Sequence, residues 1–219
     1  MQCVVQRARL RSNHKESPCV EKRLLVVNGH PDPRPERFCA ALSDAYELGA
    51  NTGGWETRRL DVGGLALSSV ASPKPCNELP PDMMGALGDI RWSSQLAIVF
   101  PLWFDQPPAI LRALFDQLSR SNSPARSSNA NNGQPARMAR IVVTMEMPAF
   151  IYRALYRLNK TPGRENQTLS FPGIHSDEPI LIGSVHTISS EQRQHWLEAT
   201  RLYAEQGALA PLFPLRKYG

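Results

Sequence analysis

Residues 24–48 read LLVVNGHPDPRPERFCAALSDAYEL, and this stretch decides the fold class. It begins with an unbroken apolar run, Leu24 to Val27, which is typical of a parallel strand buried on both faces. After a polar break, helical spacing begins near Pro35, a residue suited to the first turn of a helix, and ends at Gly49. The inward side chains of this helix are expected to be Phe38, Ala41, Leu42, Ala45 and Leu48.

Strand-like and helix-like segments alternate along the rest of the chain. Further strands are expected at Trp55–Val62, Gln95–Phe100, Met138–Thr144 and Ile180–Val185. The charges of the first of these favour an edge position. Such alternation predicts a doubly wound α/β three-layer sandwich, with a five-stranded parallel sheet in the order 2-1-3-4-5.

Helices are expected between these strands. One covers Asp82–Trp92, and the next follows Pro107-Pro108 with Leu111, Leu114, Phe115 and Leu118 inward. Another begins at Pro148 with Ile151, Ala154, Leu155 and Leu158 inward. The last has a capping box, Ser189 with Gln192, and runs through Trp196, Ala199 and Tyr203 to Gly207. Residues Gly63–Pro81 are expected to be irregular, and the polar segment Ser119–Pro135 to be a mobile loop.

The charge distribution argues against a nucleic-acid partner. The chain of 219 residues has a net charge of +5, and its basic excess lies in residues 1–23 and at Arg216 and Lys217. The body between them is close to neutral, so no basic face is expected. We expect a basic disordered extension at 1–22, one domain at 23–210 and a tail at 211–219. A mitochondrial presequence and a start codon assigned too early remain alternatives for the extension.

The cysteines and the hydropathy indicate the compartment. Cysteines at positions 3, 19, 39 and 76 form neither a zinc motif nor a disulfide framework, so no metal site is expected. Apolar runs stay far below the ~20 residues that cross a bilayer, so no membrane span is expected. These features predict a cytoplasmic protein.

Three loops carry the candidate chemistry, because ligands of doubly wound sheets bind beyond the carboxyl ends of the strands. Residues 29–38 lead into a helix amino end, which favours an anion such as phosphate. Three prolines there lack N–H groups, so Arg34, Arg37 and the free N–H groups of the first helical turn would have to supply the missing donors. A rigid loop with solvated arginines is the alternative. In the second loop, Trp103 and Phe104 suit a planar ring, and core or dimer contacts are their alternative role.

Three segments together resemble the flavodoxin-like NAD(P)H dehydrogenase (quinone) family. They are NGHPDP with FCAALSDAY, AIVFPLWFDQPPAILRALFDQ at 97–117, and RIVVTMEMPAFIYRALYR at 140–157. The resemblance covers about residues 23 to 207. It implies a flavodoxin-like fold, FMN or FAD as cofactor, and a homodimer. It also implies ping-pong hydride transfer from NAD(P)H through flavin N5 to a quinone-like acceptor.

The resemblance also implies roles for particular residues. The phosphate would be held within 30–38, by His30, Arg34, Arg37 and Phe38. The isoalloxazine would be flanked by Pro101, Leu102, Trp103 and Phe104. Its pyrimidine edge would contact Thr144, Met145, Glu146, Met147 and Pro148. Tyr152 would lie over the flavin as the catalytic residue.

Several positions depart from the family pattern. The first loop has Arg34-Pro35-Glu36 in place of a hydroxyl residue, and Glu146 stands where relatives have glycine. A carboxylate there would repel an anionic reduced flavin, so Glu146→Gly is expected to tighten flavin binding. The family's aromatic segment at 119–135 and its histidine near Asn159 are also absent. A flavin-poor relative that acts as a regulatory or interaction subunit is therefore the alternative function. An electron-carrier flavodoxin is a weaker third, since carriers need no dinucleotide site.

Overall fold

The computed structural model describes residues 21–65, 81–121, 137–158, 171, 174–176 and 178–206. Its strands are β1 Arg23–Asn28, β2 Glu56–Asp61, β3 Gln95–Leu102, β4 Arg137–Met145, β5 Ile174–Ser176 and β6 Ile180–Ile182. Its helices are α1 Phe38–Thr52, the 3-10 turn η1 Val62–Gly64, α3 Pro81–Trp92, α4 Ala109–Ser121, α5 Ala149–Leu158 and α6 Ser190–Gln206.

The described strands form one six-stranded sheet in the order β2-β1-β3-β4-β5, and β6 also pairs with β4. All strand pairings in it are parallel. The predicted order and fold class are therefore confirmed, and β2 does lie at an edge. The expected last strand is corrected, because β5 and β6 pair with successive parts of β4 and β6 ends at Ile182.

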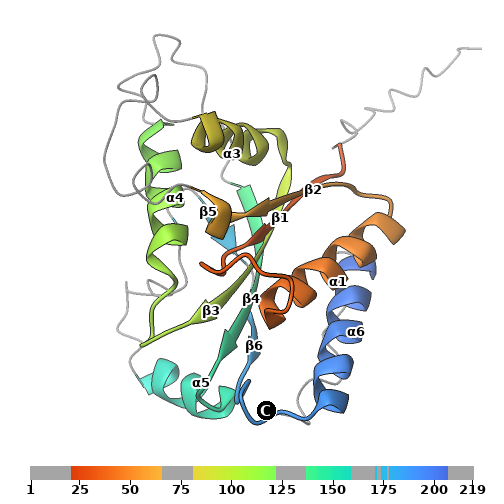
Figure 1. Ribbon diagram of the computed structural model, residues 1–219, viewed down its shortest axis with the longest axis vertical. Coiled ribbons are helices and arrows are strands. Elements are labelled where there is room, and N and C mark those ends of the chain that lie inside the picture. The colour runs from red at the N-terminus through yellow and green to blue at the C-terminus, as the bar shows by residue number, and fades with distance from the viewer. Residues whose placement is uncertain are drawn as a thin grey trace, which may run out of the picture.

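Helices cover both faces of the sheet (Figure 1). On one side α1 and α6 pack around Leu42, Tyr46 and Trp196. On the other, α3, α4 and α5 bury the largest apolar cluster, which includes Phe100 and Phe115. The strand core Leu24–Val27 is at most 2% exposed, as expected for a strand covered on both faces.

Helix α1 differs from its prediction in both ends and orientation. It begins at Phe38 rather than near Pro35, and it continues past Gly49 to Thr52. Leu48, expected inward, is 59% exposed, whereas Tyr46 is buried. The physical reason is α6: a Cβ on Gly49 would lie 2.0 Å from the Arg201 carbonyl oxygen, so this glycine lets the two helices touch. The buried face of α1 is therefore rotated relative to the predicted one.

Strand β3 continues through the predicted break at Pro101 and pairs with β4 as far as Leu102. The pairing of β1 with β3 ends at Val99, whose carbonyl oxygen accepts the Gly29 N–H at 2.7 Å. Peptide groups alternate sides along a parallel strand, so Pro101 faces the β1 side beyond the end of β1. Its missing N–H therefore removes no ladder hydrogen bond.

Helix α5 is also rotated relative to expectation. Ala149 and Tyr152 point into the core, while Ile151 is 38% exposed and Ala154 is exposed. The side chains of Leu155 and Leu158 lie outside the described residues. The tyrosine, rather than the isoleucine, fills the space over the sheet, which periodicity alone did not distinguish.

Other predictions are confirmed. The apolar stripe of α4 is buried at all of its expected positions, Leu111, Leu114, Phe115 and Leu118. The capping box of α6 forms, with the Ser189 N–H donating to Gln192 and the Gln192 N–H donating to Ser189 Oγ. The expected loop at 119–135 begins later, since α4 extends to Ser121.

Several expectations fall outside the described residues. These are the extension before residue 21, most of the 63–81 connection, the 122–135 part of the polar loop, and the tail after Gln206. Among the helices that are described, none is long and apolar enough to cross a membrane.

Candidate functional site

A pocket of about 240 Å³ opens at the carboxyl ends of β1, β3 and β4, where the strand order reverses. The predicted site residues that line it are His30, Arg37, Phe38, Pro101, Leu102, Trp103, Thr144, Met145 and Glu146. Lining residues that the sequence did not predict are Glu36, Cys39, Val185, His186 and Arg193. Arg34, Phe104, Met147, Pro148 and Tyr152 are not among the lining residues.

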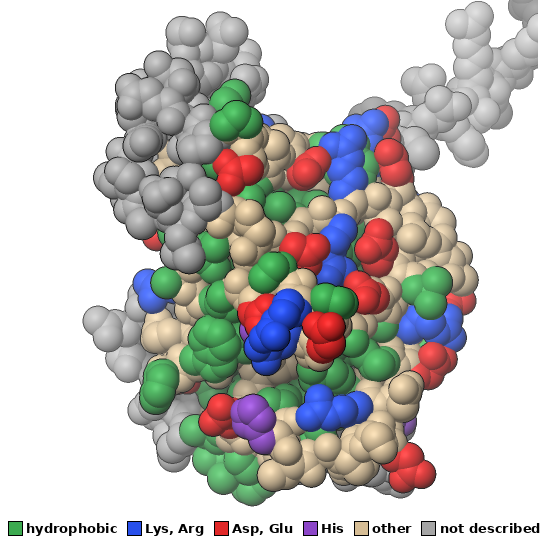
Figure 2. Space-filling view, in the orientation of Figure 1, with side chains coloured by type: hydrophobic (Ala, Val, Ile, Leu, Met, Phe, Trp, Pro, Cys, Tyr) green, Lys and Arg blue, Asp and Glu red, His purple; other side chains and the backbone are tan. Residues whose placement is uncertain are grey.

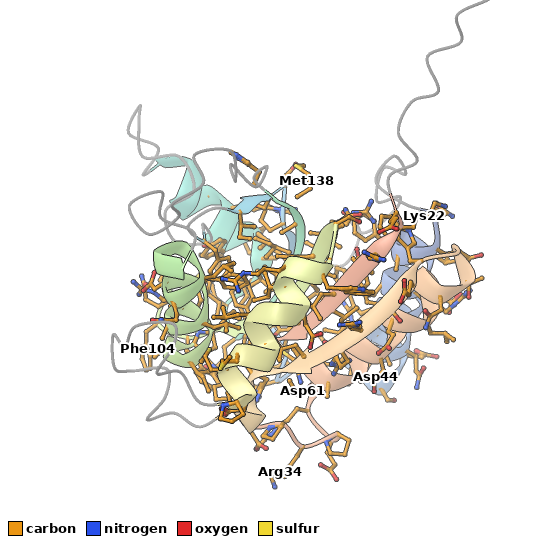
Figure 3. The ribbon with its side chains drawn as sticks, turned by 90° about the horizontal axis from the view of Figure 1, so that it is seen from above. Lys22, Arg34, Asp44, Asp61, Phe104 and Met138 are labelled. Atoms are coloured by element: carbon orange, nitrogen blue, oxygen red, sulfur yellow. The ribbon has the colours of Figure 1, made fainter. Side chains whose placement is uncertain are left out.

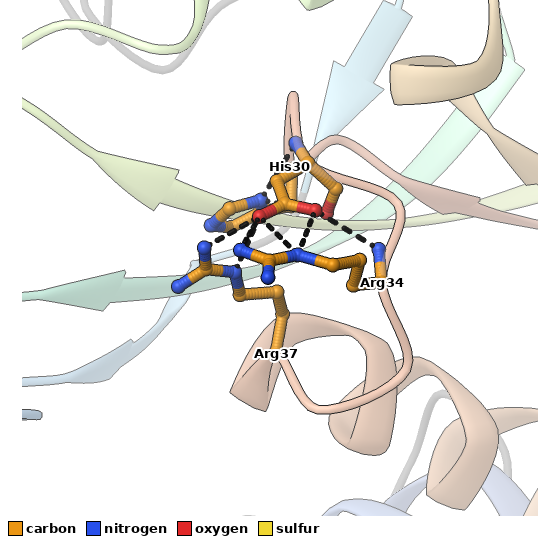
Figure 4. A network of polar contacts seen from close by, with 4 residues as sticks. His30, Arg34 and Arg37 are labelled. Carbon is orange, nitrogen blue, oxygen red and sulfur yellow. Dashed lines mark hydrogen bonds and ion pairs between the residues drawn. The ribbon is translucent and has the colours of Figure 1, made fainter.

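The loop after β1 is organised by an aspartate that the sequence analysis did not single out. The Asp32 carboxylate accepts hydrogen bonds from the guanidinium groups of Arg34 and Arg37 and from the Arg34 N–H (Figure 4). Hydrogen bonds from Arg34, then from Arg37, hold the pKa of Asp32 far below its usual range. Asp32 therefore stays charged and neutralises one of the two arginines.

The two arginines differ in where they lie. Arg34 is 65% exposed and sits on a loop that projects beyond the sheet (Figure 3), so it contacts Asp32 rather than the pocket. Arg37 is the N-cap residue of α1 and lines the pocket. The amino end of a helix has a partial positive charge, and Arg37, which shares the Asp32 carboxylate with Arg34, adds to an end that already favours anions.

His30 is fixed by its own loop. Its Nδ1 atom lies 3.0 Å from the Asp32 amide nitrogen and 2.9 Å from the Asp32 carbonyl oxygen. Its ring meets the edge of Trp103 at a centroid distance of 5.6 Å. Burial lowers the pKa of His30, so the imidazole is neutral at neutral pH. His30 thus braces the pocket wall.

Arg193 of α6 brings a second cation to the pocket. Its guanidinium stands 5.1 Å above the Phe38 ring centroid and donates to the Val185 carbonyl oxygen at 2.7 Å. Arg37 and Arg193 therefore reach the amino end of α1 from two different elements. A phosphate prefers this combination of guanidinium groups and helix end.

The floor of the pocket contains a buried thiol. Cys39 Sγ lies 3.3 Å from Thr144 Oγ1, and burial raises the pKa of the thiol to about 11. The thiolate is the reactive form of cysteine, so this side chain is kept unreactive.

Alkylation provides a test of this arrangement. At pH 8 we expect iodoacetamide to leave Cys39 unmodified in the folded protein and to modify it in denaturant, because burial blocks access and suppresses ionisation. Peptide mass spectrometry reads each cysteine separately. Rapid modification of Cys39 in the folded protein would contradict the buried floor.

The loop after β3 is a tight turn with an exposed aromatic tip. Trp103 and Gln106 exchange backbone hydrogen bonds, and Phe104 and Asp105 between them have φ angles of 48° and 63°. Positive φ is rare for a bulky residue and marks local strain. Trp103, 43% exposed, forms the pocket wall, while Phe104 is fully exposed and points away. Figure 3 shows Phe104 at the outer edge beside α4.

Glu146 has a partner that the sequence did not reveal. Its Oε1 atom lies 2.9 Å from Nε2 of His186, and both side chains are about 70% exposed. Water and the imidazole both screen the carboxylate. The repulsion of a bound anion by Glu146 is thus weaker than the sequence suggested.

Tyr152 lies away from the pocket. It is 6% exposed and belongs to the core cluster beneath α5, which also contains Phe115 and Phe171. Met147 and Pro148 continue the loop after β4 outside the pocket lining. The structure therefore brings most of the predicted binding residues together and leaves the predicted catalytic tyrosine in the core.

One feature of the sequence could have identified two of the pocket residues that were not predicted. Val185 and His186 follow the strand at 180–182, whose carboxyl end meets the same sheet edge as the three loops considered. Treating that fourth loop equally would have included His186. Arg193 had no such signal, because only the packing of α6 against α1 brings it to the pocket.

The sheet order and a pocket at its topological switch point define a doubly wound α/β protein with a pocket where such folds bind their ligands. Residues 22–206 match the family described as Flavodoxin-like fold, and the chain belongs to this family. No curated protein sequence matches it.

Solved structures show the same fold. Smu.1420 from Streptococcus mutans UA159 has a TM-score of 0.61 and 18% identity, over 84% of this chain and 99% of that one. An NAD(P)H:quinone oxidoreductase from Methanothermobacter marburgensis has a TM-score of 0.60 and 16% identity, over 84% and 94%. An FMN-dependent NADH-azoreductase from Bacillus anthracis, solved with FMN, has a TM-score of 0.54 and 11% identity, over 84% and 98%.

Proposed function

We propose that the chain binds FMN in this pocket and acts as an NAD(P)H-dependent oxidoreductase with a quinone-like acceptor. The observation that carries the proposal is one pocket in which two guanidinium groups meet the amino end of α1 beside an apolar, aromatic wall. Similar structures named as quinone oxidoreductase and FMN-dependent azoreductase support it. FMN is preferred to FAD because the similar structures name FMN.

The donor set suits a phosphate at one end and a flat ring at the other. Arg37, Arg193 and the first turn of α1 would bind the phosphate, which offsets the N–H groups that the prolines lack. Pro101, Leu102 and Trp103 would lie against the ring. The cavity of about 240 Å³ is smaller than the roughly 300–1,000 Å³ of most ligand sites, so part of the ring would remain outside.

When bound, FMN would supply hydride transfer between NAD(P)H and the acceptor. The side chains of the pocket would orient the bound flavin and shield it from water. Trp103 presents a large rigid surface, and neutral His30 holds that ring in place. Asp32 keeps Arg37 at the helix end by accepting hydrogen bonds from its Nε and Nη2 atoms. We propose a cytoplasmic location for this activity, because the cysteine pattern favours a reducing compartment.

Flavin binding is the direct test. We expect purified protein, titrated with FMN, to quench flavin fluorescence with saturable 1:1 binding and then to oxidise NAD(P)H with a benzoquinone. Failure to bind FMN or FAD at high micromolar concentration would overturn the proposal and favour the regulatory or interaction subunit. The observation that favours that alternative is that the Asp32 carboxylate is paired with both arginines of this loop and offsets part of their charge.

We also propose a homodimer formed beside the pocket, through the turn after β3 and the start of α5. The turn after β3 and the start of α5 expose large apolar side chains side by side, since Leu102 and Met145 are paired in the sheet. They are Trp103, Phe104, Met147, Phe150 and Ile151. Figure 2 shows hydrophobic side chains gathered at the lower left, where α5 lies in Figure 1. Tyr152, on the same helix, is buried and does not contribute to this surface.

Phe150→Asp is expected to convert the dimer to a monomer in light scattering, because a charge would replace a 61% exposed ring in the proposed interface. Leu48→Asp is the control, since Leu48 is 59% exposed but lies on α1 across the sheet. A parent protein that is monomeric at all concentrations, or equal effects of the two substitutions, would contradict the proposed interface.

A further inference from the structure

The mouth of the pocket carries an exposed carboxylate–imidazole pair that joins two loops. Glu146 follows β4 and His186 follows β6, and both line the pocket. Their side chains meet at 2.9 Å between Oε1 and Nε2. The two loops thus place a hydrogen-bonded acid–base pair where a ligand would enter.

Backbone hydrogen bonds, rather than the ion pair, fix this arrangement. The Ser184 N–H donates to the Met147 carbonyl oxygen at 3.2 Å, and the Val185 N–H donates to that of Met145 at 3.1 Å. Arg193 holds the Val185 carbonyl oxygen from the other side. An exposed ion pair contributes little to stability by itself, so these backbone hydrogen bonds determine how the two loops are placed.

The other charged groups of the pocket differ from His186 in the partners that hold them. Those that face it from the neighbouring elements are Glu36, Arg37, Glu146 and Arg193, with His30 as the second imidazole. Arg37 is held by Asp32, and Arg193 holds Val185. The Nδ1 atom of His30 contacts the backbone of Asp32, whereas Glu146 contacts Nε2 of His186. That geometry directs Nδ1 of His186 away from Glu146.

We propose that His186 is the proton donor to the reduced acceptor and that Glu146 is its positioning residue. This inference rests on the proposed function. A quinone that receives a hydride, with both of its electrons, becomes a hydroquinone monoanion, while the dihydronicotinamide supplies the two electrons. The His186 imidazolium then gives its Nδ1 proton to the oxyanion, which yields the neutral hydroquinone.

The pair is suited to this step. After the transfer His186 is neutral and keeps its Nε2–H, which donates to Glu146, so the orientation of the ring is retained. With the side chain 72% exposed, the ring regains a proton from water. Tyr152, which the resemblance placed over the flavin as the catalytic residue, is buried and is not among the residues that line the pocket, whereas His186 is.

The decisive experiment compares two acceptors on the FMN-loaded protein. Reduction of a quinone takes up protons, whereas reduction of ferricyanide takes up none. For His186→Gln we expect quinone turnover at neutral pH to fall about 100-fold, a typical loss for a general acid, while ferricyanide turnover stays within twofold. Glu146→Gln should reduce quinone turnover less and shift its pH profile. His175→Gln, an exposed histidine on β5, is the control and should change neither activity.

A second readout needs no turnover. Nitrogen-15 spectra of the histidine rings in the flavin-free protein should show a change at His186 Nε2 in Glu146→Gln and none in His175→Gln. Equal losses with both acceptors, or unchanged quinone turnover in His186→Gln, would overturn the inference. If the parent protein reduced neither quinone nor ferricyanide, the proposed function itself would be overturned, so the two failures are distinguishable.

Discussion

Arg193→Gln is expected to weaken FMN binding about 10- to 100-fold while leaving riboflavin binding unchanged. Arg193 supplies one of two guanidinium groups at the amino end of α1. A hydrogen bond to a charged group contributes about 1.5–3 kcal/mol, which corresponds to this range of affinity. Riboflavin lacks the phosphate, so its affinity reports only the ring end of the pocket.

Fluorescence titration of both ligands provides the measurement. Arg201→Gln is a matched control on the same helix, because Arg201 bonds to Glu198 and Glu205 rather than to the pocket. Thermal unfolding checks that Arg193→Gln folds despite losing its bond to Val185. An equal loss for FMN and riboflavin would contradict a phosphate site at this position.

Gly49→Ala is expected to reduce the free energy of unfolding by about 2–3 kcal/mol. The added Cβ would lie 2.0 Å from the Arg201 carbonyl oxygen and 3.0 Å from the Ala204 Cβ, so α1 and α6 would have to separate. Overpacking of a well-packed interface costs about 1–3 kcal/mol, and a clash with backbone cannot be relieved by rotating a side chain.

Denaturant unfolding measures the effect, and Gly85→Ala is its control. Gly85 lies on the exposed face of α3, and nothing lies within 4 Å of its added Cβ. Alanine stabilises an exposed helix position by roughly 0.5–1 kcal/mol, so the two substitutions should have opposite signs. A stabilising Gly49→Ala would show that α1 and α6 do not touch there.

Part of the candidate site was accessible to sequence reasoning. The loops after the first, third and fourth strands were located correctly, and His30, Arg37 and Trp103 do line one pocket. The position of these loops in the alternating pattern was sufficient to place them together, because parallel strands all end at the same edge of the sheet. The same reasoning failed for Arg34 and Phe104. The side chain of Arg34 is directed by its hydrogen bonds to Asp32, and that of Phe104 by a turn with positive φ.

The sequence by itself determined the class of fold, the order of the strands and the edge of the sheet where the site lies. These depend on local patterns, namely continuous apolar runs, helical spacing and caps such as Ser189 with Gln192. Tertiary structure decided which side of α1 and α5 is buried, and it brought Arg193 and His186 to the pocket. The physical reason is that helix rotation and loop pairing are set by contacts between residues far apart in the chain, such as Gly49 with Arg201 and Glu146 with His186.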